Sequence, residues 1–309
     1  MQLGIIGLGK MGGNMARRIL RGGLGVSVFD RNAPKIKTLA EAGAKGAASL
    51  EELVKGLAAP RAVWIMLPAG KPVDDTVAKL KGLLEKGDII VDGGNSHYTD
   101  DVRRARDLAG TGIYYVDAGV SGGIWGLEEG YCMMLGGPRE AFDMLSPYLK
   151  ALAPAAGYLH CGPSGAGHFV KMVHNGIEYG MMSAYAEGFS LLEASEYSKD
   201  FDFAGIAKLW NTGSVVRSWL LELAQRAFEE DGRLAGVEGY VEDSGEGRWT
   251  LQYAVESGTP TPVIAASLFS RFTSRGKSDF AFRLEAALRK QFGGHAIKTA
   301  AGNGGKAAK

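Results

Sequence analysis

The sequence predicts an α/β chain in which a doubly wound parallel sheet is followed by an all-α helical domain. Over the first half, short β-branched runs alternate with helical patterns, and parallel strands need such crossover connections between neighbours. After residue 162 only long helical patterns follow. The 309 residues are about twice the length of a typical domain of about 150 residues, which favours two domains.

Each expected strand is a short apolar run next to a turn or a helical pattern. These strands comprise residues 3–6, 26–29, 62–66, 89–91, 114–116 and 132–135, and residues 11–21 are expected to form the first helix. The second half is expected to form helices over residues 166–194, 203–211, 214–229 and 261–291, the last broken near Gly276.

Glycines with Pro163 and Ser164 mark the change between the two patterns, because such residues interrupt regular elements. We therefore expect a first domain with the sheet over residues 1–162 and a second, helical domain over residues 163–292. Residues 293–309 are rich in glycine, alanine and lysine and cannot bury enough apolar area to offset their ordering entropy. This tail is expected to be partly disordered.

Composition narrows the classes of partner. The 35 basic and 34 acidic residues give a formal net charge of +1, so nothing attracts nucleic acid or anionic lipid globally. The apolar runs are shorter than the roughly 20 residues of a membrane-spanning helix, which predicts a soluble cytoplasmic protein without membrane or nucleic-acid partners. Cys132 and Cys161 match no paired metal-ligand spacing, and no metal is expected.

A glycine motif follows the first expected strand directly and opens a helix: Gly7, Leu8, Gly9, Lys10, Met11 and Gly12. In this Gly-x-Gly-x-x-Gly pattern the first glycine permits a tight turn, the second a close approach to a pyrophosphate, and the third close helix packing. The helix N-terminus then directs unpaired amides at the phosphates. The first domain is therefore predicted to be Rossmann-like and to bind a dinucleotide.

Asp30 ends the second expected strand, where a carboxylate can accept hydrogen bonds from the adenosine ribose and repel a 2′-phosphate. It favours NAD. Arg31 follows immediately, and a guanidinium can pair with a 2′-phosphate, so use of NADP is also possible.

One helix in the second half carries a polar stripe. At about 100° per residue, Lys171, His174, Asn175 and Glu178 fall on one face of residues 166–194, within otherwise apolar surroundings. Glycine loops are expected after the fourth and fifth strands, around Asn95 and over residues 117–123, at the sheet edge where ligands bind. The stripe is predicted to face this ligand, the alternative being a structural pairing of Lys171 with Glu178.

These residues resemble the decarboxylating 6-phosphogluconate dehydrogenases of the pentose phosphate pathway, in a short form. The resemblance lies in the dinucleotide loop, residues 92–96, 120–123 and 171–179, and the Gly-Glu-Gly-Arg-Trp-Thr string at 245–250. It implies that Lys171 is the general base and acid and that Glu178 is the second acid. Implied substrate or nicotinamide contacts are Asn95, Ser121, Gly122, Gly123, His174, Asn175, Tyr179 and Arg271, and implied cofactor contacts include Leu67, Pro68, Ala69 and Asn95.

The resemblance also implies a homo-oligomer, dimer or tetramer. Residues 289–295, with Arg289 and His295, are similar to a stretch of longer members that reaches the neighbouring subunit's site. Three departures stand out: Asp30 replaces the asparagine of NADP-selective members, Pro68 stands where they often carry lysine, and Ser244 lies where a substrate-site lysine can occur.

Two other functions stay open. A related β-hydroxyacid dehydrogenase such as 3-hydroxyisobutyrate dehydrogenase also uses a helix lysine with an asparagine four residues later, but it needs no acid at position 178. A non-catalytic dinucleotide-sensing protein is a second alternative, against which the intact stripe of Lys171 and Glu178 argues.

Overall fold

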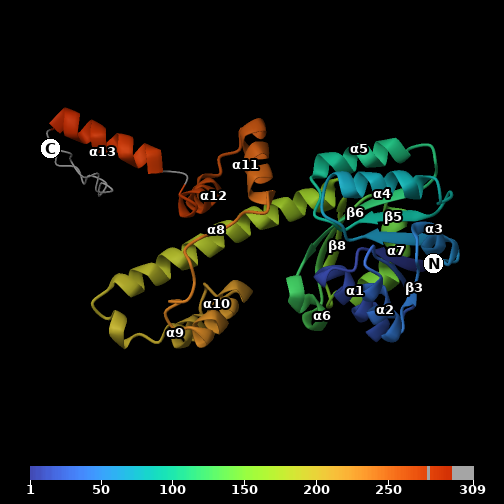
Figure 1. Ribbon diagram of the computed structural model, residues 1–309, viewed down its shortest axis with the longest axis horizontal. Helices are drawn as coiled ribbons and strands as arrows, with labels where there is room; N and C mark the ends of the chain where they lie inside the picture. Colours follow the sequence, from blue (N-terminus) through green and yellow to red (C-terminus); the bar gives the residue numbers. More distant parts are fainter. Residues whose placement is uncertain (277–278, 294–309) are drawn as a thin grey trace, which may run out of the picture. The chain divides into compact units, whose positions relative to one another are not determined.

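The computed structural model describes residues 1–276 and 279–293 (Figure 1). Its contacts divide the chain into one unit over Met1–Gly176 and a second over Ile177–Lys309. The long helix α8, Ala166–Ala194, begins in the first unit and continues into the second, and it has the bounds that the sequence predicts.

The first unit is built on an eight-stranded sheet with the order β3-β2-β1-β4-β5-β6-β7-β8. All neighbours pair in parallel except β6 and β7, which are antiparallel. This arrangement confirms the predicted doubly wound, mainly parallel sheet. The strands are β1 Gln2–Ile6, β2 Val26–Phe29, β3 Lys45–Gly46, β4 Arg61–Ile65, β5 Ile89–Asp92, β6 Tyr114–Ser121, β7 Cys132–Gly136 and β8 Tyr158–Gly162.

The sheet differs from the expectation in three strands. β3 and β8 were not predicted. β3 has only two residues and β8 carries His160 and Cys161, so neither is an apolar run. β6 continues through residues 117–121, which were expected to form a loop, because they pair with β7 from Asp117↔Gly136 to Ser121↔Cys132. The loop begins only at Gly122.

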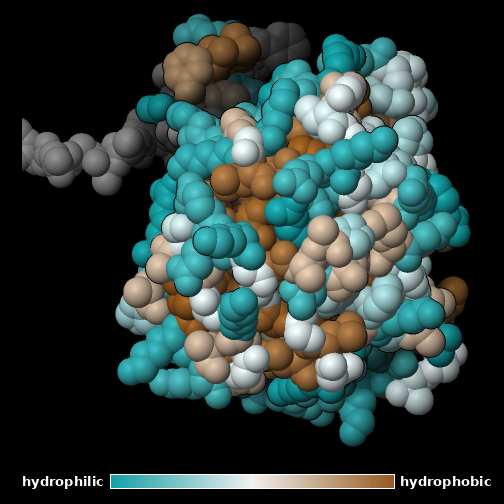
Figure 2. Space-filling view, turned by 90° about the vertical axis from the view of Figure 1, so that its right-hand side faces the viewer, coloured by the Kyte–Doolittle hydropathy of each residue, from teal (hydrophilic) through white to brown (hydrophobic). Residues whose placement is uncertain are grey.

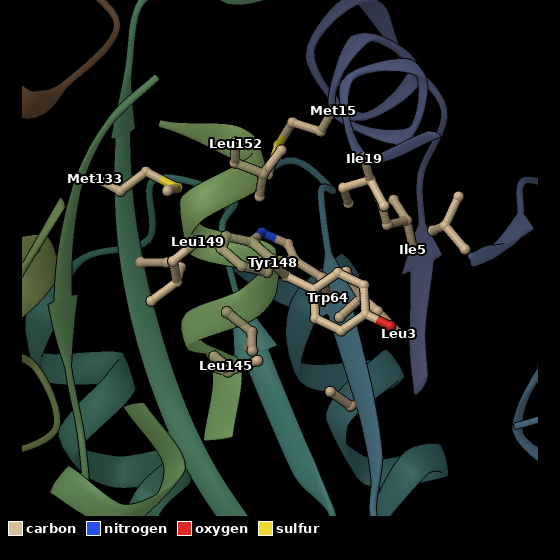
Figure 3. Packing of buried hydrophobic residues seen from close by; sticks show 14 of the residues in the cluster. Leu3, Ile5, Met15, Ile19, Trp64, Met133, Leu145, Tyr148, Leu149 and Leu152 are labelled. Atoms are coloured by element: carbon tan, nitrogen blue, oxygen red, sulfur yellow. The ribbon is translucent and has the colours of Figure 1, made fainter. Parts of the chain in front are cut away.

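Helices cover both faces of this sheet (Figure 1). On one face α1 and α7 contribute Met15, Ile19 and Leu149, which pack on Leu3 and Trp64 of the strands (Figure 3). The other face packs against α3, α4 and α5 through a second buried cluster. The helices are α1 Lys10–Arg21, α2 Ala33–Glu41, α3 Leu50–Lys55, α4 Lys71–Lys81, α5 Tyr98–Leu108, the 3₁₀ turn η1 Gly123–Trp125, α6 Gly126–Glu129 and α7 Arg139–Leu152.

The second unit is helical, as expected. Beside the rest of α8 it contains η2 Ser198–Asp200, α9 Phe203–Trp210, α10 Trp219–Glu230, α11 Glu246–Ser257, α12 Pro262–Ser274 and α13 Asp279–Gly293. Phe189 of α8 packs with Phe203, Ala207 and Leu221 of α9 and α10.

Two helices of the second unit differ from the expectation. α10 begins after Ser218, whose hydroxyl accepts a hydrogen bond from the Leu221 amide and so caps the helix five residues later than predicted. α11 was not predicted, because its polar and glycine-rich start shows no apolar period.

The surface of the first unit is mixed. On the face shown in Figure 2, hydrophilic side chains cover much of the area and hydrophobic ones show between them. Among the described residues, no helix combines the length and the apolar character that crossing a membrane requires. The predicted tail, residues 293–309, lies outside the described residues except for Gly293, the last residue of α13.

Candidate active site

The dinucleotide loop has the shape that its glycines predict. Gly7 has φ +92°, and a Cβ atom there would lie 2.9 Å from Leu67 Cδ2. A Cβ on Gly12 would lie 3.1 Å from Met66 Cβ and closer still to the Gly7 carbonyl. A Cβ on Gly9 would meet nothing within 4 Å, so the backbone beside Gly9 borders open space at the start of α1. This opening fits the pyrophosphate of a dinucleotide.

The burial of the side chains in this loop also leaves the start of α1 open. Leu8 is buried, Met11 is half-buried, and Lys10 and Gly9 are exposed. Lys10 therefore borders the opening at the helix start, whereas Leu8 anchors the loop in the core.

The Asp30 carboxylate is tied to the same loop. Its Oδ2 accepts a hydrogen bond from the Leu8 amide at 2.6 Å, and its Oδ1 accepts one from the Asn32 amide at 2.8 Å. Arg31 is exposed, and Lys35 Nζ lies 3.7 Å from Asp30 Oδ2. Sequence reasoning missed Lys35, although its place in the first turn of the helix after Asp30 was a usable signal.

Loops after β4 and β5 meet beside the glycine loop. Leu67 is half-buried, while Pro68 and Ala69 are exposed. Asn95 has φ 54°, and its Oδ1 atom is buried with no hydrogen-bond partner among the described residues. A buried amide oxygen without a partner is costly unless something satisfies it, so Asn95 is suited to hold a ligand group.

The end of β6 carries three more of the predicted site residues. Ser121 is the last residue of the strand, and Gly122 and Gly123 lead into the 3₁₀ turn η1. Ser121 and Gly122 are half-buried and Gly123 is exposed. The three residues thus extend from the sheet edge toward solvent.

Three members of the predicted polar stripe meet on α8. Lys171 Nζ donates to Asn175 Oδ1 at 2.7 Å, and His174 Nδ1 lies 3.0 Å from the same oxygen. Because an amide oxygen only accepts, His174 donates from Nδ1. Lys171 is 6% exposed. Glu178 follows two turns later on the same helix and is half-buried.

Beneath these loops lies a buried charged cluster that sequence reasoning missed. His168 Nδ1 lies 2.7 Å from Asp101 Oδ2, and Arg104 Nη1 donates to Asp92 Oδ2 at 2.9 Å. Asp117 accepts hydrogen bonds from the Gly165 amide at 2.6 Å and the His168 amide at 2.9 Å. The repeated acidic residues at strand ends were the available signal.

The ionisation of this cluster follows from burial and from the pairing of His168 with Asp101. Burial raises the pKa of Asp101 to about 6, although the neighbouring His168 opposes the shift. Burial alone would lower the pKa of His168, but the Asp101 carboxylate outweighs it and raises that pKa to about 9. At pH 7 His168 is therefore protonated and Asp101 ionised.

The same cluster contains a group of possible metal ligands that the sequence did not indicate. The sequence indicated no group of metal ligands, yet ligand atoms of Asp92, Asp101 and His168 lie within 4.8 Å of one another. The Arg104 guanidinium already supplies a cation there, 2.9 Å from Asp92 and 3.6 Å from Asp101. The geometry is that of a salt-bridge network.

In the second unit, Arg271 lies over the ring of Tyr179. The guanidinium carbon is 3.5 Å from the ring centroid, and Nη1 donates to the Glu242 carbonyl at 2.8 Å. Tyr179 is 4% exposed, and its hydroxyl accepts from the Ser244 amide at 3.3 Å. Arg271 also lines a cavity of about 640 Å³. An anion binding there would meet a guanidinium held in a fixed plane.

Two further arginines lie on Asp243, next to Ser244. Arg248 and Arg275 each donate to this carboxylate at 2.5 Å, and their hydrogen bonds lower its pKa to about 2. Sequence reasoning missed this cluster, although Asp243 and Arg248 are only five residues apart; Arg275 lies 32 residues from Asp243 along the chain. Arg289 lies in α13, and His295 lies outside the described residues.

Family comparisons cover almost the whole chain. Residues 2–162 match the NAD binding domain of 6-phosphogluconate dehydrogenase, and residues 167–303 match the C-terminal domain of 6-phosphogluconate dehydrogenase.

Individual relatives agree with the family match. The chain is 46% identical to the NAD(+)-dependent, decarboxylating 6-phosphogluconate dehydrogenase of Haloferax volcanii, over 96% of this chain and 98% of the relative. It is 38% identical to the NADP(+)-dependent enzyme of Bacillus subtilis over 90% of its length, but spans only 62% of that longer relative.

A solved structure gives the same result. The 6-phosphogluconate dehydrogenase of Plasmodium falciparum superposes with a TM-score of 0.81 at 30% identity, over 97% of this chain and 66% of the other. Together with the glycine loop and the α8 residues, these matches show that the chain belongs to the 6-phosphogluconate dehydrogenase family.

Proposed function

We propose that this protein oxidises and decarboxylates 6-phosphogluconate to ribulose 5-phosphate and CO₂ while reducing NAD. The observation that carries the proposal is the buried Lys171, hydrogen-bonded to Asn175 on α8 in a chain of this family. The alternative β-hydroxyacid dehydrogenase needs no acid at Glu178 and no phosphate-binding arginine. This chain has Glu178, and Arg271 is the proposed phosphate-binding arginine.

Lys171 is assigned the first proton transfer. Oxidation at C3 removes a hydride from carbon and a proton from the hydroxyl oxygen, and a neutral lysine amine takes that proton. The nicotinamide, when bound, supplies the hydride acceptor. Asn175 positions the amine, since its Oδ1 lies 2.7 Å from Lys171 Nζ.

Decarboxylation then needs little from the protein, because the product of oxidation is a β-keto acid. Its carboxylate leaves as CO₂ and the electrons pass to the C3 carbonyl. Protonated Lys171 stabilises the developing enolate oxygen. Glu178 donates a proton to C1 of the enediol, which yields ribulose 5-phosphate.

The remaining site residues are assigned to binding. Arg271, held over Tyr179, is the proposed phosphate ligand. Arg289 and His295 are proposed to complete the same phosphate site of a neighbouring subunit. The proposed contacts to the sugar acid or nicotinamide are Asn95, Ser121, Gly122, Gly123, His174, Asn175 and Tyr179.

The cofactor is held by the glycine loop, with Leu67, Pro68 and Ala69 beside it. Asp30 faces the ribose position from the end of β2 and disfavours a 2′-phosphate, so NAD is preferred. Exposed Arg31 and the nearby Lys35 leave some use of NADP.

A homo-oligomer is the proposed assembly. Large apolar side chains of the second unit are exposed, among them Leu191 at 74%, Val255 at 82% and Phe269 at 59%. Exposed apolar surface of this kind is typical of interfaces. Light scattering after gel filtration distinguishes monomer, dimer and tetramer. A cytoplasmic location and the lack of nucleic-acid and membrane partners stay predictions.

The test is a steady-state assay with 6-phosphogluconate, in which reduced nicotinamide and CO₂ are measured together for NAD and for NADP. We expect equal amounts of both products and a higher kcat/KM with NAD. Turnover of 3-hydroxyisobutyrate alone would identify the rival dehydrogenase. Dinucleotide binding without any turnover would identify a sensor. Lys171→Met is the control and should lose turnover while retaining dinucleotide affinity.

A further inference from the structure

The first residues of α8 lie unusually close to the sheet. A Cβ atom on Gly167 would lie 2.6 Å from the Gly136 amide nitrogen and 2.7 Å from the Asp117 carbonyl oxygen. A Cβ on Gly119 would lie 3.0 Å from Lys171 Cγ. Ordinary carbon contacts are about 3.5–4.0 Å, so the helix sits on β6 and β7 with no room to spare. The position of Lys171 is therefore set by how α8 is seated.

Hydrogen bonds to the sheet and to α5 fix the start of α8 in this position. Asp117 of β6 accepts the Gly165 and His168 amides, which are orphan donors at the start of the helix. The His168 side chain points to α5 instead, where its Nδ1 meets Asp101 Oδ2 at 2.7 Å. His168 is 2% exposed and Asp101 is completely buried.

Asp101 is in turn connected to the loop that carries Asn95. The Tyr115 hydroxyl of β6 donates to Asp101 Oδ1 at 2.7 Å. Arg104, one turn along α5 from Asp101, donates to Asp92 and to Ser96 Oγ, on either side of Asn95. One hydrogen-bonded network thus reaches from α8 to the end of β5.

We infer that His168 and Asp101 are positioning residues for the reaction proposed above, and that their buried hydrogen bond seats α8 so that Lys171 stands at its reacting position. The inference rests on the proposed function, because it concerns the position of Lys171 for the proton transfer assigned to it. Neither side chain is assigned a contact with substrate or cofactor.

The chemistry of the cluster supports a positioning role over a purely stabilising one. Burying an ion pair costs desolvation energy, and a well-packed apolar pair of similar size is often as stable or more so. The charged groups facing His168 are Asp101 and Arg104 of α5, Asp92 of β5 and Asp117 of β6. An apolar pair would fill the space, but it would not specify the direction of the helix.

Matched substitutions test the inference. In His168→Asn the side-chain amide can place a donor near the former position of Nδ1, which faces Asp101. In His168→Gln the donor lies near the former position of Nε2. The Nε2 atom of His168 has no hydrogen-bond partner among the described residues. We expect kcat per folded molecule to fall at least tenfold in His168→Leu, Asp101→Asn and His168→Gln, and to recover at least fivefold in His168→Asn relative to the Gln variant. KM for NAD should stay within twofold throughout.

Val77→Ala is the control for lost stability. Val77 is buried in α4, on the other core cluster, and its truncation should lower the unfolding midpoint without changing kcat per folded molecule. The folded fraction is measured by circular dichroism. The Asn and Gln variants keep the test usable if the Leu variant does not fold.

The outcomes are separable. Equal kcat for the Asn and Gln variants, or a His168→Leu variant with wild-type kcat, would overturn the positioning role while the wild-type assay still supports the proposed function. A wild-type protein that does not turn over 6-phosphogluconate would instead refute the proposed function, and the inference with it.

Discussion

Replacing Gly119 by alanine should displace Lys171 without touching the dinucleotide loop. The new Cβ would lie less than 3.0 Å from Lys171 Cβ, 3.0 Å from its Cγ and 3.1 Å from the Gly167 carbonyl oxygen. Carbon atoms pack at about 3.5–4.0 Å, so Lys171 Cβ and with it α8 must move by roughly 1 Å or more. It cannot move into the sheet, because Gly167 already fills that approach. Lys171 therefore moves away from β6.

This displacement is expected to lower both the unfolding free energy and kcat. Overpacking a core costs about 1–3 kcal/mol of unfolding free energy, and a misplacement of about 1 Å at a reacting group can lower the rate about 100-fold. We expect kcat for 6-phosphogluconate to fall by about two orders of magnitude in Gly119→Ala, with KM for NAD unchanged, because the glycine loop lies on β1.

The assay combines steady-state kinetics, urea unfolding and NAD titration on the same preparation. Gly25→Ala is the matched control, because a Cβ there meets nothing within 4 Å. It should leave kcat and the unfolding midpoint unchanged. A Gly119→Ala protein that folds and keeps kcat within threefold of wild type would show that the reaction tolerates the displacement, and the role given to Lys171 at this place would be wrong.

Three further predictions concern other parts of the chain. Asp30→Asn should shift the ratio of kcat/KM values toward NADP by about tenfold, because a charged acceptor contributes about 1.5–3 kcal/mol; an unchanged ratio would refute the ribose contact. Arg271→Lys should raise KM for 6-phosphogluconate about tenfold at constant KM for NAD, because lysine loses the planar stack on Tyr179; equal effects on both would point to misfolding. The unfolding free energy should fall by up to about 3 kcal/mol as pH rises from 6.5 to about 9, because folding raises the pKa of His168 and its stabilising proton is lost over that window. Urea unfolding at several pH values checks this, and His168→Asn should flatten the curve.

Sequence alone determined the features that depend on neighbours along the chain. The glycine loop, the bounds of α8 and the line of Lys171, His174 and Asn175 on one helix face all follow from local period and spacing. Helix period and turn chemistry are properties of residues a few positions apart, so the local sequence carries the information that places these elements. For the same reason the main strands lie close to their predicted positions.

Only the tertiary structure decided which segments distant in the sequence pair or pack together. β8 exists because β7 offers it a paired edge, and residues 117–121 are strand because an antiparallel neighbour pairs with them. His168 and Asp101 are 67 residues apart, and no spacing in the sequence predicts their hydrogen bond. The close approach of Gly119 to Lys171 likewise joins a strand to a helix that begins much later. Such contacts depend on which surfaces pack together after the sheet has formed, and one-dimensional patterns carry little of that information.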